Sequence, residues 1–126
     1  MTQPDVPSVV SLAVAGNIAT VTLNRPQARN ALNTQLCVEL HVALREIGAR
    51  TDIHVLLIRA NGPVFCAGAD LKERKLMDED QIRARRIKAF ALYAALENLP
   101  MPVIAVIQGP AVGSGCEIAS ACDFIV

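Results

Sequence analysis

The stretch that most constrains the fold is residues 64–72, which read Val-Phe-Cys-Ala-Gly-Ala-Asp-Leu-Lys. An apolar start followed by three small residues predicts the end of a buried strand, a tight turn and a helix start. Asp70 is a favourable N-cap residue, and Glu73 three positions later strengthens the helix-start signal. Backbone N–H groups at such a helix start favour negative charge. Taken alone, an ordinary capped connection is the more common explanation of this pattern.

A second pattern of the same kind follows near the end of the sequence. Residues 101–108 have the apolar character of a buried strand, and residues 109–117 form a glycine-rich turn that opens a helix. Ser114 and Glu117 have the spacing of a capping box. Two such turns can direct two backbone N–H groups at one oxygen. That arrangement holds the oxyanion of an enolate, where one missing donor slows the reaction by roughly 100- to 1000-fold.

With an earlier segment, the two turns resemble the enoyl-CoA hydratase/isomerase family, also called the crotonase family. The matching segments are Leu23-Asn24-Arg25-Pro26 with Asn30-Ala31-Leu32, then residues 65–72, and then residues 102–123. They occur in the family's order and with family-like spacing, and the resemblance runs from about Ile18 to the last residue. It implies an α/β fold in which repeated ββα units wind into the crotonase core. Residues 1–126 would form the N-terminal part of one such domain.

The chemistry that the resemblance implies is the addition of water to a 2-enoyl-CoA thioester. The thioester oxygen would lie between the backbone N–H groups of Ala69 and Ser114, which would stabilise the developing enolate. Glu117 would transfer a proton as general acid/base. From spacing alone, the capping box with Ser114 explains Glu117 better, and the two roles compete for one carboxylate.

Coenzyme A, as part of the substrate, is the one cofactor that the resemblance implies, and no metal is expected. In the family, the loop that contains Arg25 lies along the coenzyme, and Ala28 is the closest match to its contact residue. Gln27 stands where a basic residue is common, so Arg25 and Arg29 are candidates to replace it. Solvated loop arginines are the alternative explanation. The other residues expected beside the coenzyme are Ala67, Asp70, Leu71 and Lys72.

Residues 72–88 carry seven basic and four acidic side chains, a local net charge of +3 that suits a polyanionic ligand. A solvated helix is the simpler explanation for most of them, and without interleaved aromatic residues the cluster is weak support for RNA binding. Apolar residues at 82, 87, 90, 91 and 94 mark a long helix that ends before Pro100. Four apolar residues are candidates for an acyl pocket, although such residues more often belong to the core: Leu71, Leu76, Met77 and Tyr93.

The remaining sequence predicts a hairpin of residues 9–15 and 18–23 around Gly16-Asn17, a helix from Asn33 to about Ala49, and a strand over residues 53–58. Basic and acidic residues balance at 12 each, which does not favour a nucleic-acid partner, and no apolar run reaches the length needed to span a membrane. Residues 1–8 lack the basic and apolar regions of a signal peptide. No two of the four cysteines have C-x-x-C spacing. A cytoplasmic protein is therefore expected.

Two departures from the family pattern bear on function. Ser114 stands where the family usually has glycine, and the second glutamate that the hydratases use would lie beyond Val126. Family members are longer, and their C-terminal half supplies the rest of the site and the contacts of a homotrimer or a dimer of trimers. Two alternatives therefore stay open: another family reaction, namely isomerisation, hydrolysis or decarboxylation, and a non-catalytic acyl-CoA-binding fragment. Neither the acyl chain length nor the pathway can be deduced.

Overall fold

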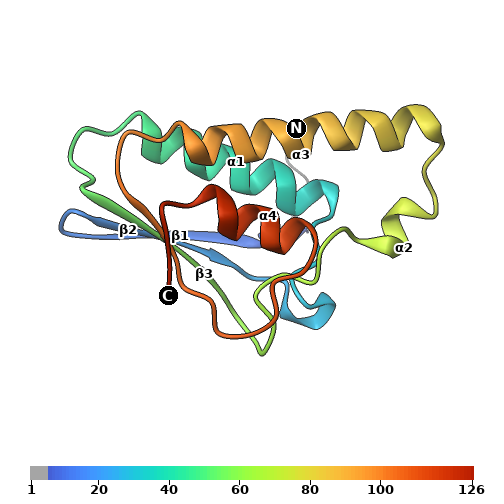
Figure 1. Ribbon diagram of the computed structural model, residues 1–126, viewed down its shortest axis with the longest axis horizontal. Helices are drawn as coiled ribbons and strands as arrows, with labels where there is room; N and C mark the ends of the chain where they lie inside the picture. The colour runs from blue at the N-terminus through green and yellow to red at the C-terminus, as the bar shows by residue number, and fades with distance from the viewer. Residues whose placement is uncertain (1–5) are drawn as a thin grey trace.

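A computed structural model describes residues 6–126 and shows one five-stranded sheet with helices packed against it (Figure 1). The strands lie in the order β1-β2-β3-β4-β5, which is also their order along the chain. Helix α1 packs on β1 and β2, and helix α3 packs on α1 and α4. Helix α3 is therefore farther from the sheet than α1 is.

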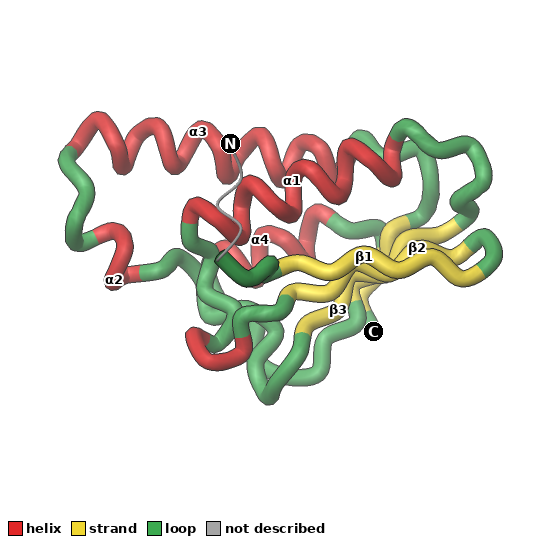
Figure 2. The backbone as a smooth tube through the Cα atoms, turned by 180° about the vertical axis from the view of Figure 1, so that it is seen from behind, coloured by secondary structure: helices red, strands yellow, loops and turns green. Residues whose placement is uncertain are grey.

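The sheet begins with a hairpin, whose turn lies at the right of Figure 2, and continues with parallel strands. Strands β1 (Val10–Ala15) and β2 (Ile18–Leu23) are antiparallel, as the alternating pattern around Gly16-Asn17 predicts. Strand β3 (Val55–Ala60) runs parallel to β2, and β4 (Val103–Ala105) and β5 (Phe124–Ile125) continue the parallel order. The parallel strands bring the loops that follow β2, β3 and β4 to the same end of the sheet.

Helix α1 (Thr34–Gly48) confirms the predicted helix and its N-cap. The Asn33 side chain accepts a hydrogen bond of 2.8 Å from the backbone N–H of Leu36. One face of α1 is buried against the sheet, since leucine, alanine and isoleucine recur at helical spacing there. The predicted core residues on this face are all buried: Leu36, Leu40, Ala43, Leu44 and Ile47.

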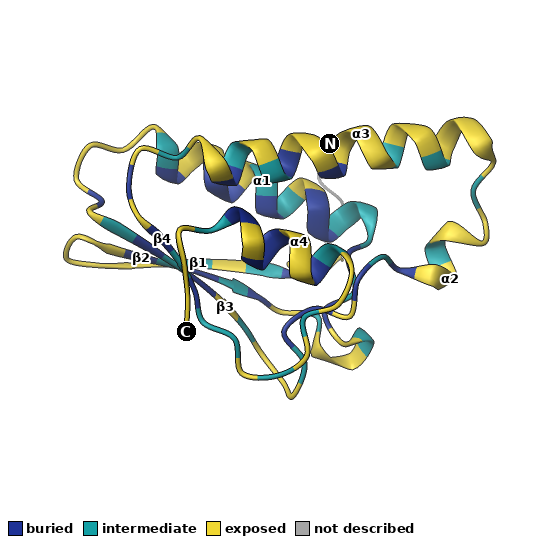
Figure 3. Ribbon diagram, in the orientation of Figure 1, coloured by how far each residue is buried: buried dark blue, intermediate teal, exposed yellow. Residues whose placement is uncertain are grey.

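Helix α3 (Glu79–Glu97) confirms the predicted long helix but buries a different set of residues. It begins with a complete capping box between Asp78 and Gln81. Its buried residues are Ala89, Leu92 and Leu96, whereas Ile87 and Phe90 are 63% and 57% exposed. Figure 3 shows most of α3 in the colour of exposed residues. Within residues 6–126, no helix combines the length and the apolar character needed to cross a membrane.

The strands predicted before the two turns are shorter than the apolar patterns suggest. Only Val103–Ala105 pairs as a strand before the second turn. Before the first turn no strand forms, because the N–H groups of Phe65 and Cys66 both donate to the carbonyl of Pro110 in a neighbouring loop. Cys66 makes one isolated bridge with Ala111. The apolar side chain of Phe65 is fully buried, so the pattern reflects burial rather than strand pairing.

Helix α1 has a buried and an exposed side, so substitutions on the two sides should differ in their effect on the free energy of unfolding. Leu40→Ala should lower the free energy of unfolding by about 2–5 kcal/mol, because it leaves a cavity in the core. Val42→Ala, on the 57% exposed side of the same helix, should change it by less than about 0.5 kcal/mol. Urea denaturation of both variants measures the difference, and equal values would contradict the packing described here.

Candidate active site

The two glycine-containing turns lie against each other. The N–H of Val112 donates to the carbonyl of Cys66 over 3.0 Å. Gly68 has a φ of +101°, and a Cβ atom on it would stand 3.0 Å from the carbonyl oxygen of Val112 and 3.8 Å from the nitrogen of Ser114. A Cβ on Gly115 would lie only 2.3 Å from the carbonyl oxygen of Cys66. The small residues are therefore needed because one backbone touches the other.

The N–H of Ala69 points away from the residues that hold its turn. Leu32 donates its N–H to the carbonyl of Gly68 over 2.7 Å. A trans peptide group is planar, and its C=O and N–H point in opposite directions. The N–H of Ala69 shares this peptide group with the Gly68 carbonyl, so it points away from Leu32. Within residues 6–126 it has no backbone or side-chain acceptor.

The N–H of Ser114 is free for a related reason. Ser114 is the first residue of helix α4 (Ser114–Ala121), and the carbonyl of Gly113 accepts the N–H of Glu117 over 2.9 Å. The Ser114 N–H therefore points out of the helix N-terminus, where intrahelical partners are missing. In the described part of the chain nothing accepts it. The structure thus brings together two turns, each with one N–H that has no acceptor among the described residues.

Glu117 does not form the capping box that its spacing suggests. The N-cap of α4 is Gly113, and no side chain caps this helix. Ser114 lies one position too far along the chain for its hydroxyl to act as an N-cap. The prediction of a Ser114–Glu117 capping box is therefore wrong, because a glycine with positive φ starts the helix instead. The Glu117 carboxylate is left exposed and without a capping role.

Glu117 and Ser114 line a hollow of about 260 Å³ beside helix α3. The remaining lining residues come from α3 and from α2 (Leu71–Arg74): Arg74, Ile82, Arg85, Arg86, Ala89, Phe90 and Tyr93. Burial raises the pKa of the Tyr93 phenol, an effect that the Ser114 hydroxyl opposes and the Glu117 carboxylate reinforces. The hollow is thus lined by one carboxylate, three arginines, one phenol and Ser114.

The whole of this arrangement falls within one match to a known family. The family model described as enoyl-CoA hydratase/isomerase matches residues 13–126. The chain belongs to the enoyl-CoA hydratase/isomerase family. The predicted crotonase-type α/β fold is confirmed, since solved structures of enoyl-CoA hydratases share it over more than nine tenths of this chain.

Similar proteins within the family include hydratases and proteins named for two activities. The chain is 41% identical over 115 residues to the short-chain-enoyl-CoA hydratase of Clostridium acetobutylicum, covering 90% of this chain and 44% of that protein. It is 40% identical over 112 residues to the enoyl-CoA isomerase/hydratase fer4 of Mycosarcoma maydis, covering 82% and 41%. The crystal structure of the enoyl-CoA hydratase from Bacillus anthracis has a TM-score of 0.90 at 37% identity, covering 93% and 46%. The chain thus spans less than half the length of these family members.

Arg25 and Asp70, both predicted to contact coenzyme A, form an ion pair of 2.7 Å inside the protein. Asp70 also caps α2, since the N–H groups of Lys72 and Glu73 donate to its Oδ1 over 3.0 and 3.1 Å. Burial by itself raises the pKa of the Asp70 carboxyl. The hydrogen bond from the Glu73 N–H and the Arg25 guanidinium outweigh it, so this pKa lies below its ordinary value.

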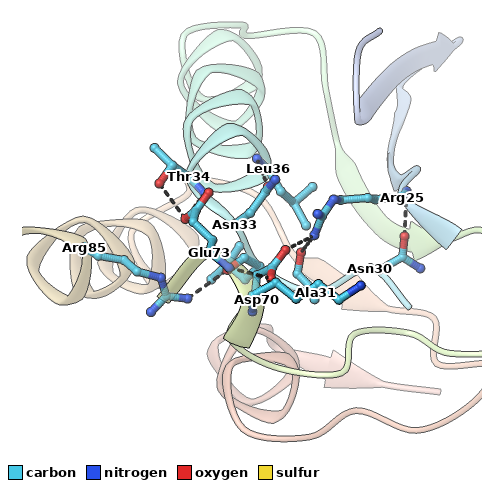
Figure 4. A network of polar contacts seen from close by, with 11 residues as sticks. Arg25, Asn30, Ala31, Asn33, Thr34, Leu36, Asp70, Glu73 and Arg85 are labelled. Atoms are coloured by element: carbon cyan, nitrogen blue, oxygen red, sulfur yellow. Dashed lines mark hydrogen bonds and ion pairs between the residues drawn. The ribbon is translucent and has the colours of Figure 1, made fainter. Parts of the chain in front are cut away.

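Glu73 does not interact with its own N-cap residue, Asp70, as the spacing in the sequence suggests. Its carboxylate accepts the N–H of Thr34 over 2.9 Å and the Thr34 hydroxyl over 2.8 Å. Thr34 is the first residue of α1, so Glu73 binds the N-terminus of another helix and not its own N-cap (Figure 4). This contact joins the turn at Ala69 to α1.

The other residues predicted to contact the coenzyme lie at or near the protein surface. Ala67, Leu71 and Lys72 are exposed, and Ala28 is half-buried at the end of η1 (Pro26–Ala28). Of the candidate acyl-pocket residues, Tyr93 lines the hollow, whereas Leu71 and Leu76 are 65% and 88% exposed. The coenzyme contacts therefore stay predictions.

Sequence reasoning missed the arginines of the hollow as site residues. Arg85 and Arg86 belong to the basic segment, which the sequence assigns mainly to solvent. Ile82, Arg85, Ala89 and Tyr93 recur every three or four positions along α3, so they share one side of the helix. That spacing could have shown that these residues share one side of α3. It could not show that this side faces α4, which lies some 30 residues away in the chain.

The close approach at Gly115 predicts a strong effect of a single methyl group. Gly115→Ala should destabilise the protein by more than 2 kcal/mol on the order-of-magnitude scale for overpacking, because its Cβ would overlap the Cys66 carbonyl. Gly16→Ala serves as the comparison, because nothing lies within 4 Å of a Cβ at Gly16, so its loss should reflect only the strain of alanine at a φ of +60° and should be smaller. Thermal unfolding of both variants measures the contrast. An equal loss in both would mean that the turns are not in contact.

The lowered pKa of Asp70 predicts a pH-dependent contribution to stability. A carboxyl whose folded-state pKa is depressed stabilises the protein above its unfolded pKa of about 4, and the contribution is lost as the pH falls through the folded value. Asp70→Asn should therefore be less stable than the parent protein at pH 7 and differ less from it at pH 3. Urea denaturation at the two pH values measures this. A difference that grows at pH 3 would contradict the sign.

Proposed function

We propose that the protein containing this chain is an enoyl-CoA hydratase, which adds water across the 2,3 double bond of an enoyl-CoA thioester. The observation that carries the proposal is the juxtaposition of two N–H groups, which have no acceptor within residues 6–126, with a carboxylate that does not cap its own helix. Ala69 and Ser114 present the N–H groups on two touching turns, and Glu117 follows Ser114 by one helical turn.

In this proposal, the thioester oxygen accepts hydrogen bonds from the Ala69 and Ser114 N–H groups. Water adds through its oxygen to the β-carbon, the π electrons move towards the thioester, and negative charge gathers on that oxygen. Donors fixed in a water-poor site stabilise this charge without having to reorganise. The α-carbon then takes a proton, which gives a 3-hydroxyacyl-CoA and consumes nothing but water.

Glu117 would act as the general acid/base of these proton transfers. It lies in the first turn of α4, and its carboxylate lines the hollow instead of capping its own helix. The serine at position 114 keeps the N–H that the role requires, so the departure from glycine does not remove the donor. A second acid/base would come from sequence outside residues 1–126.

The positively charged side chains that line the hollow favour binding of a polyanionic substrate. Arg74, Arg85 and Arg86 contribute three positive charges where Glu117 contributes one negative charge. Acyl-CoA carries phosphate groups, so attraction to this region would raise its association rate. The expected homotrimer, or dimer of trimers, and the cytoplasmic location remain part of the proposal.

Isomerisation of the double bond is the second candidate, favoured by the relative named as isomerase/hydratase. It would use the same oxyanion contacts but would move a proton between carbons and add no water. The two reactions differ in product, so one assay separates them. A 2-enoyl-CoA tests hydration, and a 3-enoyl-CoA tests isomerisation.

Glu117→Gln in the complete protein tests the proposed role. Hydration should fall by about 100- to 10,000-fold, because an amide cannot transfer the proton. Binding of a saturated acyl-CoA should persist, since the two N–H donors are untouched. Turnover is followed by the loss of ultraviolet absorbance of the conjugated thioester, and binding by calorimetry.

The matched control is Glu46→Gln, a change of the same kind on the exposed side of α1. It should leave hydration unchanged. Unaltered hydration in Glu117→Gln would remove Glu117 from the mechanism. If the unmutated protein binds acyl-CoA but turns over neither substrate, hydration and isomerisation are both excluded, which leaves hydrolysis, decarboxylation and the non-catalytic alternative.

A further inference from the structure

Arg25 connects to the Ala69 N–H through two peptide groups. Its Nη1 donates to the carbonyl of Ala31 over 2.9 Å and to Oδ2 of Asp70 over 2.7 Å (Figure 4). Both acceptors lie within the protein, and the Arg25 side chain is only 18% exposed. The guanidinium therefore faces the backbone of the 30–32 segment.

The Ala31 carbonyl and the Leu32 N–H belong to one planar peptide group. They point in opposite directions, so the hydrogen bond from Arg25, together with that from the Asn33 N–H over 3.1 Å, holds the direction of the Leu32 N–H. Leu32 in turn donates to the Gly68 carbonyl over 2.7 Å. The Gly68 carbonyl shares its peptide group with the Ala69 N–H. The Arg25 guanidinium, the Leu32 N–H and the Ala69 N–H are thus linked one after another through two peptide groups.

A second set of contacts keeps Leu32 in place. Its carbonyl accepts the N–H of Asp70 over 3.2 Å and Nη2 of Arg85 over 2.8 Å. Its side chain is 1% exposed. Leu32 can therefore neither rotate its peptide groups nor move away from Gly68 without breaking buried contacts.

The positive charge at the start of this path is opposite in sign to the negative charge that the site would hold. Hydrogen-bonded peptide groups polarise one another, and the effect is stronger where water is excluded. A guanidinium at the start of the path increases the positive character of each N–H along it. The last of these is the Ala69 N–H, which is proposed to face the thioester oxygen.

We infer that Arg25 is a positioning residue of the oxyanion site, aligning and polarising the Ala69 N–H through the Ala31–Leu32 and Gly68–Ala69 peptide groups. The inference rests on the proposed function, because it concerns the donor that would hold the thioester oxygen. It differs from the expectation that Arg25 binds the coenzyme. A coenzyme contact would act mainly on substrate binding, whereas a misaligned oxyanion donor acts mainly on the chemical step.

Arg25→Met in the complete protein separates these roles. Loss of the guanidinium should lower kcat about 10- to 100-fold, less than the roughly 100- to 1000-fold for a deleted donor, with KM changed little. Arg25→Lys should recover part of the loss, because an ammonium can reach one acceptor but lacks the fork geometry. A raised KM with unchanged kcat in Arg25→Met would overturn the inference and favour the coenzyme contact.

Two further variants distinguish the peptide path from a general loss of stability. Arg50→Met breaks an exposed ion pair with Asp52 of the same length, 2.7 Å, and should leave kcat unchanged. Asp70→Asn removes the charge paired with Arg25 but keeps a residue that can cap α2 and leaves the Ala31 contact available. Its loss of kcat should be smaller than that of Arg25→Met. An equal loss would assign the effect to the ion pair and overturn the inference.

Amide hydrogen exchange of the ligand-free protein provides a readout that does not depend on turnover. In Arg25→Met, the Leu32 amide should exchange at least about tenfold faster relative to the Leu57 amide in β3, which reports on the sheet. Unchanged relative exchange would overturn the inference even if hydration occurs. Absence of hydration in the unmutated protein would refute the proposed function, while the exchange result still decides whether Arg25 holds this path. If Arg25→Met does not fold, Arg25→Lys is compared in both measurements, and unchanged kcat and exchange there overturn the inference.

Discussion

The hydrogen bond from the Leu32 N–H to the Gly68 carbonyl is the contact on which the candidate site depends. It joins the segment before α1 to the turn before α2, two regions 36 residues apart. Because peptide groups are planar, this one bond also directs the Ala69 N–H away from Leu32. The contacts of Gly68 and Gly115 then bring this turn against the start of α4. Without the first contact, the second turn would have no fixed surface to meet.

Buried polar side chains keep the surrounding loops in one arrangement. Asn30 is fully buried with a φ of +52°, and its amide donates to the carbonyls of Asn61 and Val64 while its oxygen accepts the Arg25 N–H. A buried amide without such partners would lose its hydration at a cost of about 1–3 kcal/mol. Together with Arg25 and Asp70, Asn30 ties the loops after β2 and β3 to each other. The site is therefore assembled from loops whose geometry is specified by hydrogen bonds rather than by regular structure.

Local signals in the sequence were sufficient for the elements with strong periodicity and for the first turn. The hairpin, α1 with its Asn33 cap, and the Asp70 cap all depend on residues within a few positions of one another. The motif residues also sufficed to identify the family. By contrast, the predicted capping box of Ser114 and Glu117 and the predicted strand end at residues 64–66 were wrong. In both places a local preference lost to a contact that is distant in the chain: the Gly113–Gly68 approach and the Pro110 carbonyl.

The sequence by itself determined which backbone positions could approach closely, since only small residues at 67–69 and glycine at 113 and 115 allow such turns. It also determined the helix starts that use their own side chains. Only the tertiary structure decided which N–H groups have no acceptor within residues 6–126, that Glu73 binds the start of α1, and that Glu117 does not cap α4. These properties depend on partners from 36 to 50 residues away, such as Leu32 and Cys66 facing Gly68 and Gly115. Side-chain preferences act over one helical turn, whereas the direction of a peptide group depends on whichever distant atom completes its hydrogen bond.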